Sequence, residues 1–329
     1  MNQKPIFIIG AHKSGTTLLR NLLDGHPSLY AIPIESHFFQ ISGFWIDNEY
    51  RQQYPINLSN KDIRNRAINY ISEKNKNTNK YGGSFAKDLF NIPLFKNKFK
   101  IKHLKNNTKF ILEQYFKAIY YSINKRELGK ERRIVEKSVE NAEFAQYYNK
   151  FYPQAKFIHI IRNPYSNFVS LRKYKSIDFG YPIIRRMLRT LYNNYYYLYR
   201  NQKLIKNYFI IRYEDLVTNP SKWLKKISNF LDIEFQNSLL EPTYRVVRWK
   251  GNSLSDKNFT EISPIRLNSW KKEINPIEII YINHLFKFVL KDFDYSFFNK
   301  TGSFWNPAPG ESIKRYFANR LYRFYLQEW

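Results

Sequence analysis

Five short apolar runs recur along the chain, separated by longer stretches with helical periodicity. The runs lie near residues 5–10, 29–33, 133–137, 156–161 and 208–213. Continuous apolar runs bounded by turn residues are typical of strands that are buried on both faces of a parallel sheet. Their alternation with helical segments predicts an α/β fold, a P-loop-like doubly wound parallel sheet of about five strands flanked by helices.

The stretches between the runs predict helices. Residues 110–123 carry apolar side chains at helical spacing, and four of them are expected to face inward: Ile111, Tyr115, Ala118 and Tyr121. Residues 191–199 lie in a tyrosine-rich helix whose rings we expect to pack in the core. Asn219-Pro220 opens a further helix that runs to Phe230. A largely helical insertion over about 40–130 therefore separates the second and third strands.

No repeat or clear linker divides the chain, so a single domain over residues 1–302 is the simplest organisation. Residues 303–329 form a C-terminal tail in which apolar and basic positions alternate at helical spacing. They are the apolar Ile313, Tyr316, Phe317, Leu321, Phe324 and Tyr325 and the basic Lys314, Arg315, Arg320 and Arg323. Such a helix packs against the domain or lies on an anionic bilayer, and packing is the expected arrangement.

Composition narrows the class of protein. With 43% hydrophobic residues the chain can bury a large core, and without cysteine it has neither disulfides nor thiolate chemistry. The net charge of +27 indicates attraction to anions or a lysine-rich solvated surface, and the second is favoured because the excess covers segments without motifs. We find no nucleic-acid-binding module, signal peptide or membrane span. We therefore expect a cytoplasmic protein, with peripheral membrane contact through the tail as an alternative.

The most informative motif joins the first strand to the first helix. Residues 5–17 read P-I-F-I-I-G-A-H-K-S-G-T-T. Gly10 and Gly15 keep the spacing of the nucleoside-triphosphate loop G-x-x-x-x-G-K-[ST], and Thr17 keeps its hydroxyl. Thr16, however, stands where that loop has its lysine. A loop that keeps the anion-binding backbone and lacks the triphosphate lysine is suited to a different anion.

Backbone N–H groups of residues 13–17 converge at the start of a helix over residues 16–23, where the helix dipole favours an anion. Gly25 and Pro27 end this helix. The K-S-G-T-T string resembles the 5′-phosphosulfate loop of sulfotransferases that use 3′-phosphoadenosine 5′-phosphosulfate (PAPS). The resemblance implies cofactor contacts from Lys13, Ser14, Gly15, Thr16, Thr17 and Leu18 and no metal.

A second motif follows the fourth apolar run. Arg162 stands at the C-terminal end of the strand over 157–161, Pro164 leads into a helix, and Ser170 lies two turns along it. Ligands of open α/β sheets bind at the carboxyl ends of strands, so Arg162 is expected to face the phosphate loop. An arginine and a serine at this spacing resemble the 3′-phosphate site of the same sulfotransferases.

Two further segments resemble the cofactor site of that family. In Tyr213-Glu214-Asp215 the tyrosine corresponds to the one that approaches the adenine, and a structural or capping role is preferred for the two carboxylates. Residues 248–253 resemble the late basic loop that closes over the 3′-phosphate. The implied contacts are Arg248, Lys250, Gly251 and Asn252.

The catalytic candidates lie after the second and third strands. Glu35-Ser36-His37-Phe38-Phe39 is similar to the base-bearing segment of glycan O-sulfotransferases. Glu136-Lys137-Ser138 resembles the strand end of carbohydrate sulfotransferases, although Val139-Glu140-Asn141 replaces the usual proline and aromatic residue. The resemblance implies that Lys13 neutralises the leaving nucleotide, Lys137 assists at the sulfuryl oxygens and Glu35 deprotonates the acceptor. His37 orients the acceptor or shares the role of base.

These motifs identify the chain as similar to PAPS-dependent sulfotransferases, nearest to the glycan O-sulfotransferases and tyrosylprotein sulfotransferases. The resemblance implies in-line transfer from PAPS to a hydroxyl of a glycan or glycolipid, with adenosine 3′,5′-bisphosphate as product. The acceptor pocket is expected to come from the insertion at 40–130. Two alternatives stay open: a diverged P-loop kinase, which Thr16 disfavours, and a catalytically silent anion- or membrane-binding protein on the same fold.

Overall fold

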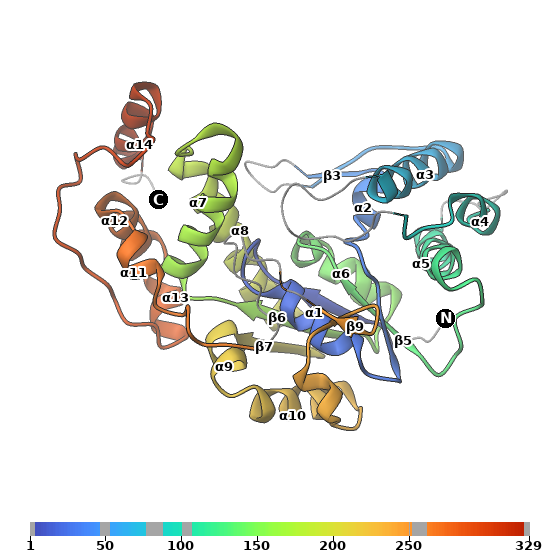
Figure 1. Ribbon diagram of the computed structural model, residues 1–329. Helices are drawn as coiled ribbons and strands as arrows, with labels where there is room; N and C mark the ends of the chain where they lie inside the picture. Colours follow the sequence, from blue (N-terminus) through green and yellow to red (C-terminus); the bar gives the residue numbers. More distant parts are fainter. Residues whose placement is uncertain are drawn as a thin grey trace.

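The five apolar runs form one parallel sheet in the computed structural model, which describes residues 4–46, 53–76, 88–100, 107–249, 251 and 262–325. Its strand order is β2-β5-β1-β6-β7, and each neighbouring pair is parallel (Figure 1). The strands are β1 (Ile6–Ile9), β2 (Leu29–Ala31), β5 (Arg133–Lys137), β6 (Lys156–Ile161) and β7 (Tyr208–Arg212). The predicted α/β fold is confirmed. The motif-bearing segments after β1, β2, β5, β6 and β7 all leave the same edge of the sheet.

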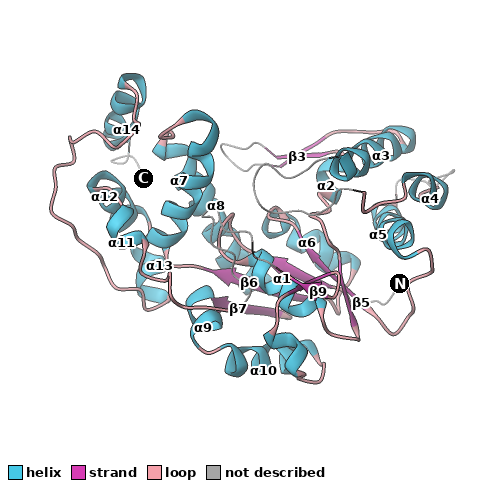
Figure 2. Ribbon diagram, in the orientation of Figure 1, coloured by secondary structure: helices cyan, strands magenta, loops and turns pink. Residues whose placement is uncertain are grey.

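Alternate side chains of the strands pack on opposite faces of the sheet. In β1, Ile6 and Ile8 belong to one hydrophobic core, whereas Phe7 and Ile9 belong to another. Helices cover both faces, as Figure 2 shows. The helices are α1 (Thr16–Asp24), α9 (Tyr213–Thr218) and α10 (Pro220–Leu231) on the first face, and α6 (Asn141–Phe151), α7 (Pro164–Phe179) and α8 (Ile184–Leu204) on the second. The helices predicted outside the insertion are present, and Asn219 caps α10 through the backbone N–H of Lys222.

The insertion between β2 and β5 is largely helical, as predicted. It contains α2 (Phe38–Ile41), β3 (Phe44–Ile46), β4 (Gln53–Pro55), α3 (Asn60–Lys76), α4 (Ile92–Lys98) and α5 (Thr108–Asn124). In α5, Ile111, Tyr115 and Ala118 are buried as expected. The expectation for Tyr121 is wrong: Tyr120 takes the interior position, while the Tyr121 ring lies nearer the surface, 5.2 Å from Nζ of Lys98.

The chain after α10 returns to both sides of the sheet. Its elements are η1 (Asn237–Leu240), β8 (Thr243–Tyr244), β9 (Val247–Arg248), α11 (Trp270–Glu273), α12 (Pro276–Leu285), α13 (Lys287–Asp292) and α14 (Ile313–Tyr325). The tail is helical and packs against the domain, because Tyr322 joins the core that contains Ile184 and Tyr281. The division at residue 302 stays a prediction. Across the residues that the structure describes, every helix is too short or too polar to cross a bilayer.

Candidate active site

The loop between β1 and α1 is held against α7. Asn167 Nδ2 donates a hydrogen bond to the carbonyl of His12 at 2.7 Å. Arg162 Nη1 donates to the carbonyl of Lys13 at 3.0 Å. Lys13 itself adopts a left-handed backbone conformation, with φ of +65°. The predicted proximity of Arg162 to the phosphate loop is therefore present, and Arg162 also anchors the loop.

Glycine is required at the turn that starts α1. Gly15 has φ of +108°, and a Cβ at this position would lie 2.5 Å from the ring of Tyr213. At Gly10 a Cβ would lie 2.6 Å from the carbonyl oxygen of Ile160. The close approach lets the loop sit directly over β6 and β7. The first N–H groups of α1, which have no partner within the helix, then lie at the carboxyl edge of the sheet.

A cavity of about 1000 Å³ opens at this edge and collects residues from the phosphate loop, from the strand ends and from α7. Most of the predicted site residues line it: Lys13, Gly15, Thr16, Thr17, Leu18, Glu35, Lys137, Arg162, Ser170, Tyr213 and Gly251. Ser14 is buried beneath the loop, and Arg248 lies on β9 with its side chain exposed. Lys250 and Asn252 lie outside the described residues.

Among the cations that line this cavity, Lys13, Lys137 and Arg162 lie close enough to affect one another. Burial lowers the pKa of Lys13, and the positive charges of Lys137 and Arg162 lower it further, although the carboxylate of Glu35 opposes them. Arg162 also lies over the ring of Tyr213, 4.8 Å from its centroid. Within the described part of the chain, buried Ser14 Oγ and Arg162 Nε have no hydrogen-bond partner. Concentrated positive charge beside unsatisfied polar groups is the arrangement that an anion completes.

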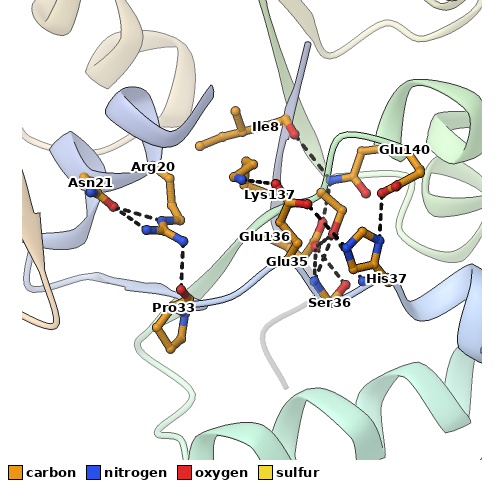
Figure 3. Close-up of polar contacts among 12 residues, drawn as sticks. Ile8, Arg20, Asn21, Pro33, Glu35, Ser36, His37, Glu136, Lys137 and Glu140 are labelled. Carbon is orange, nitrogen blue, oxygen red and sulfur yellow. Dashed lines mark hydrogen bonds and ion pairs between the residues drawn. The ribbon is translucent and has the colours of Figure 1, made fainter. Parts of the chain in front are cut away.

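Glu35 lies at the centre of a chain of charged groups on the other side of the cavity (Figure 3). Lys137 Nζ donates to Glu35 Oε1, and His37 Nε2 lies 3.3 Å from Glu35 Oε2. On its far side, His37 Nδ1 lies 3.0 Å from Glu140 Oε2. The sequence predicts Glu35, His37 and Lys137 as candidates, and the structure brings all three together. Glu140 was not a predicted site residue, and its position in a segment that departs from the family pattern offered no signal.

The buried carboxylate of Glu136 fixes the segment that carries Glu35. It accepts a hydrogen bond from Ser36 Oγ at 2.7 Å and others from Ser138 Oγ and Asn141 Nδ2. The backbone N–H of Ser36 donates to Ser138 Oγ at 2.9 Å. These bonds tie residues after β2 to the end of β5, as Figure 3 shows. In the sequence, the signal for this anchor is the glutamate that follows Ile134 and Val135 in the strand R-I-V-E-K.

The charges in this chain shift each pKa in a definite direction. Burial by itself would raise the pKa of Glu35, but the charge of Lys137 and the hydrogen bond from His37 hold it well below 4.5. Burial would lower the pKa of His37, but the carboxylates of Glu140 and Glu35 raise it to about 10. At neutral pH, Glu35 is therefore ionised and His37 is an imidazolium that lies between the carboxylates of Glu35 and Glu140.

Glu35, His37 and Glu140 also have ligand atoms that lie within 4.8 Å of one another. With His37 protonated, the two carboxylates are balanced by His37 and Lys137, so the chain of four groups has no net charge to attract a cation. The prediction that the enzyme needs no metal stays open to test.

The remaining predicted residues occupy distinct places. Ser170 lies on α7 and lines the cavity together with Arg162. Glu214 accepts hydrogen bonds from the backbone N–H of Asn163 at 3.0 Å and from Tyr295 at 2.9 Å. The preferred structural role for this carboxylate is thereby confirmed.

Comparison with known proteins identifies the family. The chain matches the model of the sulfotransferase family over residues 5–237 and belongs to that family. It is therefore a sulfotransferase, of the class that uses PAPS, as the motifs predict, and the kinase alternative is set aside. Curated protein sequences include no match to it.

Two solved structures resemble the whole fold. The sulfotransferase domain from the curacin biosynthetic pathway is 19% identical with a TM-score of 0.54, over 89% of this chain and 98% of that one. The sulfotransferase domain of the Synechococcus PCC 7002 olefin synthase is 20% identical with a TM-score of 0.53, over 87% and 95% of the two chains. At this level of identity the likeness shows a shared fold and no more.

Proposed function

We propose that this sulfotransferase transfers the sulfuryl group of PAPS to a hydroxyl of a glycan or glycolipid, with Glu35 as general base. The observation that carries the proposal is the placement of Glu35 and Lys137 in one cavity with Lys13 and Arg162. A carboxylate that could take a proton from the acceptor hydroxyl thus lies in the same cavity as a cluster of cations that could bind the phosphates of the donor. The buried Ser14 hydroxyl and Arg162 Nε, which have no partner among the described residues, support a bound nucleotide with two phosphate groups.

Each end of the nucleotide has its own set of residues. Thr16, Thr17 and the N–H groups at the start of α1 would hold the 5′-phosphate. Arg162 and Ser170 would hold the 3′-phosphate, because a guanidinium grips phosphate with two parallel hydrogen bonds. Tyr213 would lie beside the adenine. The assignments of Arg248, Lys250, Gly251 and Asn252 to the closing loop stay predictions.

PAPS supplies an activated sulfuryl group on a phosphate that departs as the acceptor oxygen attacks. Lys13 would neutralise the charge that grows on the departing phosphate, and Lys137 would contact the transferred oxygens. Sulfuryl transfer parallels phosphoryl transfer, in which positioning and charge stabilisation provide most of the catalysis. The fixed backbone of the phosphate loop suits that role.

The charges favour Glu35 over His37 as the base. An imidazolium with a pKa near 10 holds its proton at neutral pH and has no site to accept another. Glu35 is ionised, although its ion pair with Lys137 makes it a weak base. If Lys137 turns to the sulfuryl oxygens, that ion pair weakens and the pKa of Glu35 rises, which strengthens the base where it is needed. His37 would then orient the carboxylate.

The cavity offers groups that suit a sugar acceptor. Tyr174 and Ser176 of α7, Tyr181 and Asn275 line it and provide aromatic faces and hydrogen-bonding groups. Lys74 of α3 also lines the cavity, in keeping with a contribution of the insertion to the acceptor site.

The test is transfer of radiolabelled sulfate from PAPS to a panel of acceptors, comprising oligosaccharides, glycolipids, phenols and tyrosine peptides. The proposal expects labelled sugar and no labelled phenol or peptide. Transfer to the phenol or the peptide alone would overturn the acceptor class and leave the sulfotransferase reaction intact. Binding of adenosine 3′,5′-bisphosphate without transfer to any acceptor would favour a silent protein on the same fold.

A further inference from the structure

Helix α14 packs on the domain with its polar side and turns its apolar side to the solvent. Asn319, Arg320 and Tyr322 are at most 5% exposed. The exposed side chains form a stripe: Ile313 (79% exposed), Phe317 (57%), Leu321 (52%) and Phe324 (63%). At about 100° per residue, these four positions fall within an arc of roughly 80°. We refer to Ile313, Phe317, Leu321 and Phe324 as the apolar stripe.

Buried polar contacts fix this orientation. Arg320 Nη1 lies 2.9 Å from each carboxylate oxygen of Glu311, and Asn319 Nδ2 donates to Glu311 at 2.7 Å. Asn319 Oδ1 accepts from the backbone N–H of Ile184 at 2.8 Å, and Tyr281 donates to the carbonyl of Asn319. Rotation of α14 to bury the apolar stripe would leave buried charges without partners, which is strongly unfavourable. The stripe is therefore held outward by the fold.

The surroundings of the apolar stripe are basic. Residues 313–325 contain no acidic side chain, and neither does the neighbouring helix α8. Lys314 and Arg323 flank the stripe on its two sides and are exposed, and Arg186 is exposed on the first turn of α8. A second copy of the chain would bring like charges together at this face. An anionic lipid surface complements both the charges and the apolar side chains.

We propose that α14 docks the protein on an anionic lipid bilayer, with the apolar stripe inserted at the headgroup boundary and Lys314, Arg323 and Arg186 against the headgroups. Figure 1 shows α14 at the edge of the molecule beside α7. Arg315 donates a hydrogen bond to the carbonyl of Tyr181. Both Tyr181 and Pro309, which lies just before the helix, line the cavity. Docking would bring the rim of the cavity to the membrane. This location favours an acceptor that is carried by a lipid, an inference that rests on the proposed function.

Cosedimentation of the full chain with vesicles tests the docking surface. We expect binding to phosphatidylcholine vesicles that contain about one third phosphatidylglycerol, weak binding to pure phosphatidylcholine, and a decrease with salt. The double variant F317S/F324S removes two exposed rings and should weaken binding by roughly tenfold or more. K314E and R186E should each weaken it by about fivefold or more. The matched control V246S/V247S alters two exposed apolar residues of the β8–β9 hairpin and should bind like the parent.

Thermal unfolding verifies that each variant is folded, and binding is measured without nucleotide. Equal binding of F317S/F324S and the parent would overturn the proposal in favour of adsorption by general charge. A second result would also overturn the proposal: the parent does not bind vesicles but forms a dimer, and F317S/F324S dissociates that dimer. The apolar stripe would then be an interface between two copies of the chain. Transfer of sulfate to a water-soluble acceptor should be unchanged in F317S/F324S. Loss of transfer in every protein, with vesicle binding intact, would refute the proposed function alone.

Discussion

The side chains at the cavity fall into two groups, one proposed to bind the sulfuryl donor and one proposed to act on the acceptor hydroxyl. Lys13 and Arg162 lie on the phosphate-loop side, joined through the bond from Arg162 to the Lys13 carbonyl. Glu35 and Lys137 line the same cavity and contact each other, and His37 contacts Glu35 without being one of the lining residues. Substitutions at these positions should therefore separate cofactor binding from proton removal.

The exchange Glu35→Gln keeps the size of the side chain and removes the base. We expect turnover to fall by about 10²–10⁴-fold, with the affinity for adenosine 3′,5′-bisphosphate nearly unchanged. Steady-state rates and calorimetric titration of the bisphosphate measure the two effects. His37→Ala should reduce turnover less. An active Glu35→Gln enzyme beside an inactive His37→Ala enzyme would transfer the role of base to His37.

Arg162→Ala and Lys13→Ala should affect different kinetic constants. Loss of the guanidinium should weaken nucleotide binding by roughly 1.5–3 kcal/mol, because charge-assisted hydrogen bonds disappear. Loss of the Lys13 ammonium should reduce turnover by on the order of 10²-fold, because the charge it meets grows in the transition state. Arg162→Lys keeps the charge without the planar fork and serves as an intermediate control. Equal losses of affinity in both alanine variants, with turnover intact, contradict the assigned roles.

At the level of elements, the site depends on how the end of β5 meets the segment after β2. Glu136 on β5 holds Ser36 in place, and Glu140, which immediately precedes α6, faces His37. The Glu140 carboxylate is the main group that raises the pKa of His37. A group whose pKa is higher in the folded state stabilises the fold below its unfolded pKa of 6.5, and that stabilisation is lost as the pH rises through about 10.

Glu140→Gln should therefore reduce stability in a pH-dependent manner. Without the carboxylate, the pKa of His37 falls, so we expect a loss on the order of 1–3 kcal/mol in the free energy of unfolding near pH 6. The difference between the two proteins should shrink as the pH rises through about 10, because His37 then loses its proton in the parent as well. Urea unfolding near pH 6 and above about pH 10 measures it. The same difference at both values would mean that Glu140 acts through packing and not through the charge of His37.

For the whole molecule, the net charge of +27 has two separate consequences. Inside the cavity, Lys13, Lys137 and Arg162 gather at the carboxyl edge of the sheet. On the outside, exposed basic side chains flank α14. Only the first group is expected to respond to a nucleotide.

Adenosine 3′,5′-bisphosphate should stabilise the protein without any metal. A ligand that binds only the folded state adds about 2.7 kcal/mol at a hundredfold excess over its dissociation constant. Thermal shift with the bisphosphate, with and without a chelator, measures this effect, and the chelator should change nothing. ATP with magnesium should give a smaller shift, because Thr16 replaces the lysine that reaches the outer phosphates. A larger shift with ATP and magnesium refutes the PAPS site.

The sequence by itself determined the sheet and the phosphate loop, because these depend on residues close together in the chain. An apolar run specifies a buried strand, and the few residues after it specify the loop. The proximity of Arg162 to the phosphate loop also followed from position, since carboxyl ends of parallel strands share one edge, whereas Glu35 and Lys13 were chosen by resemblance to the family motifs. In α5, helical periodicity alone predicted that Tyr121 faces inward, whereas the buried residue is its neighbour Tyr120.

Only the tertiary structure decided the contacts between distant segments. Lys137 meets Glu35 across 102 positions, and the Glu140 carboxylate sits beyond His37, so neither pKa shift is visible in a local pattern. The direction of α14 is a similar case. Its amphipathic pattern indicates that the apolar side packs inward, but the buried pair of Arg320 and Glu311 turns that side outward. Burial of a charge is tolerated only with a partner, and the partner is known only when the chain has folded.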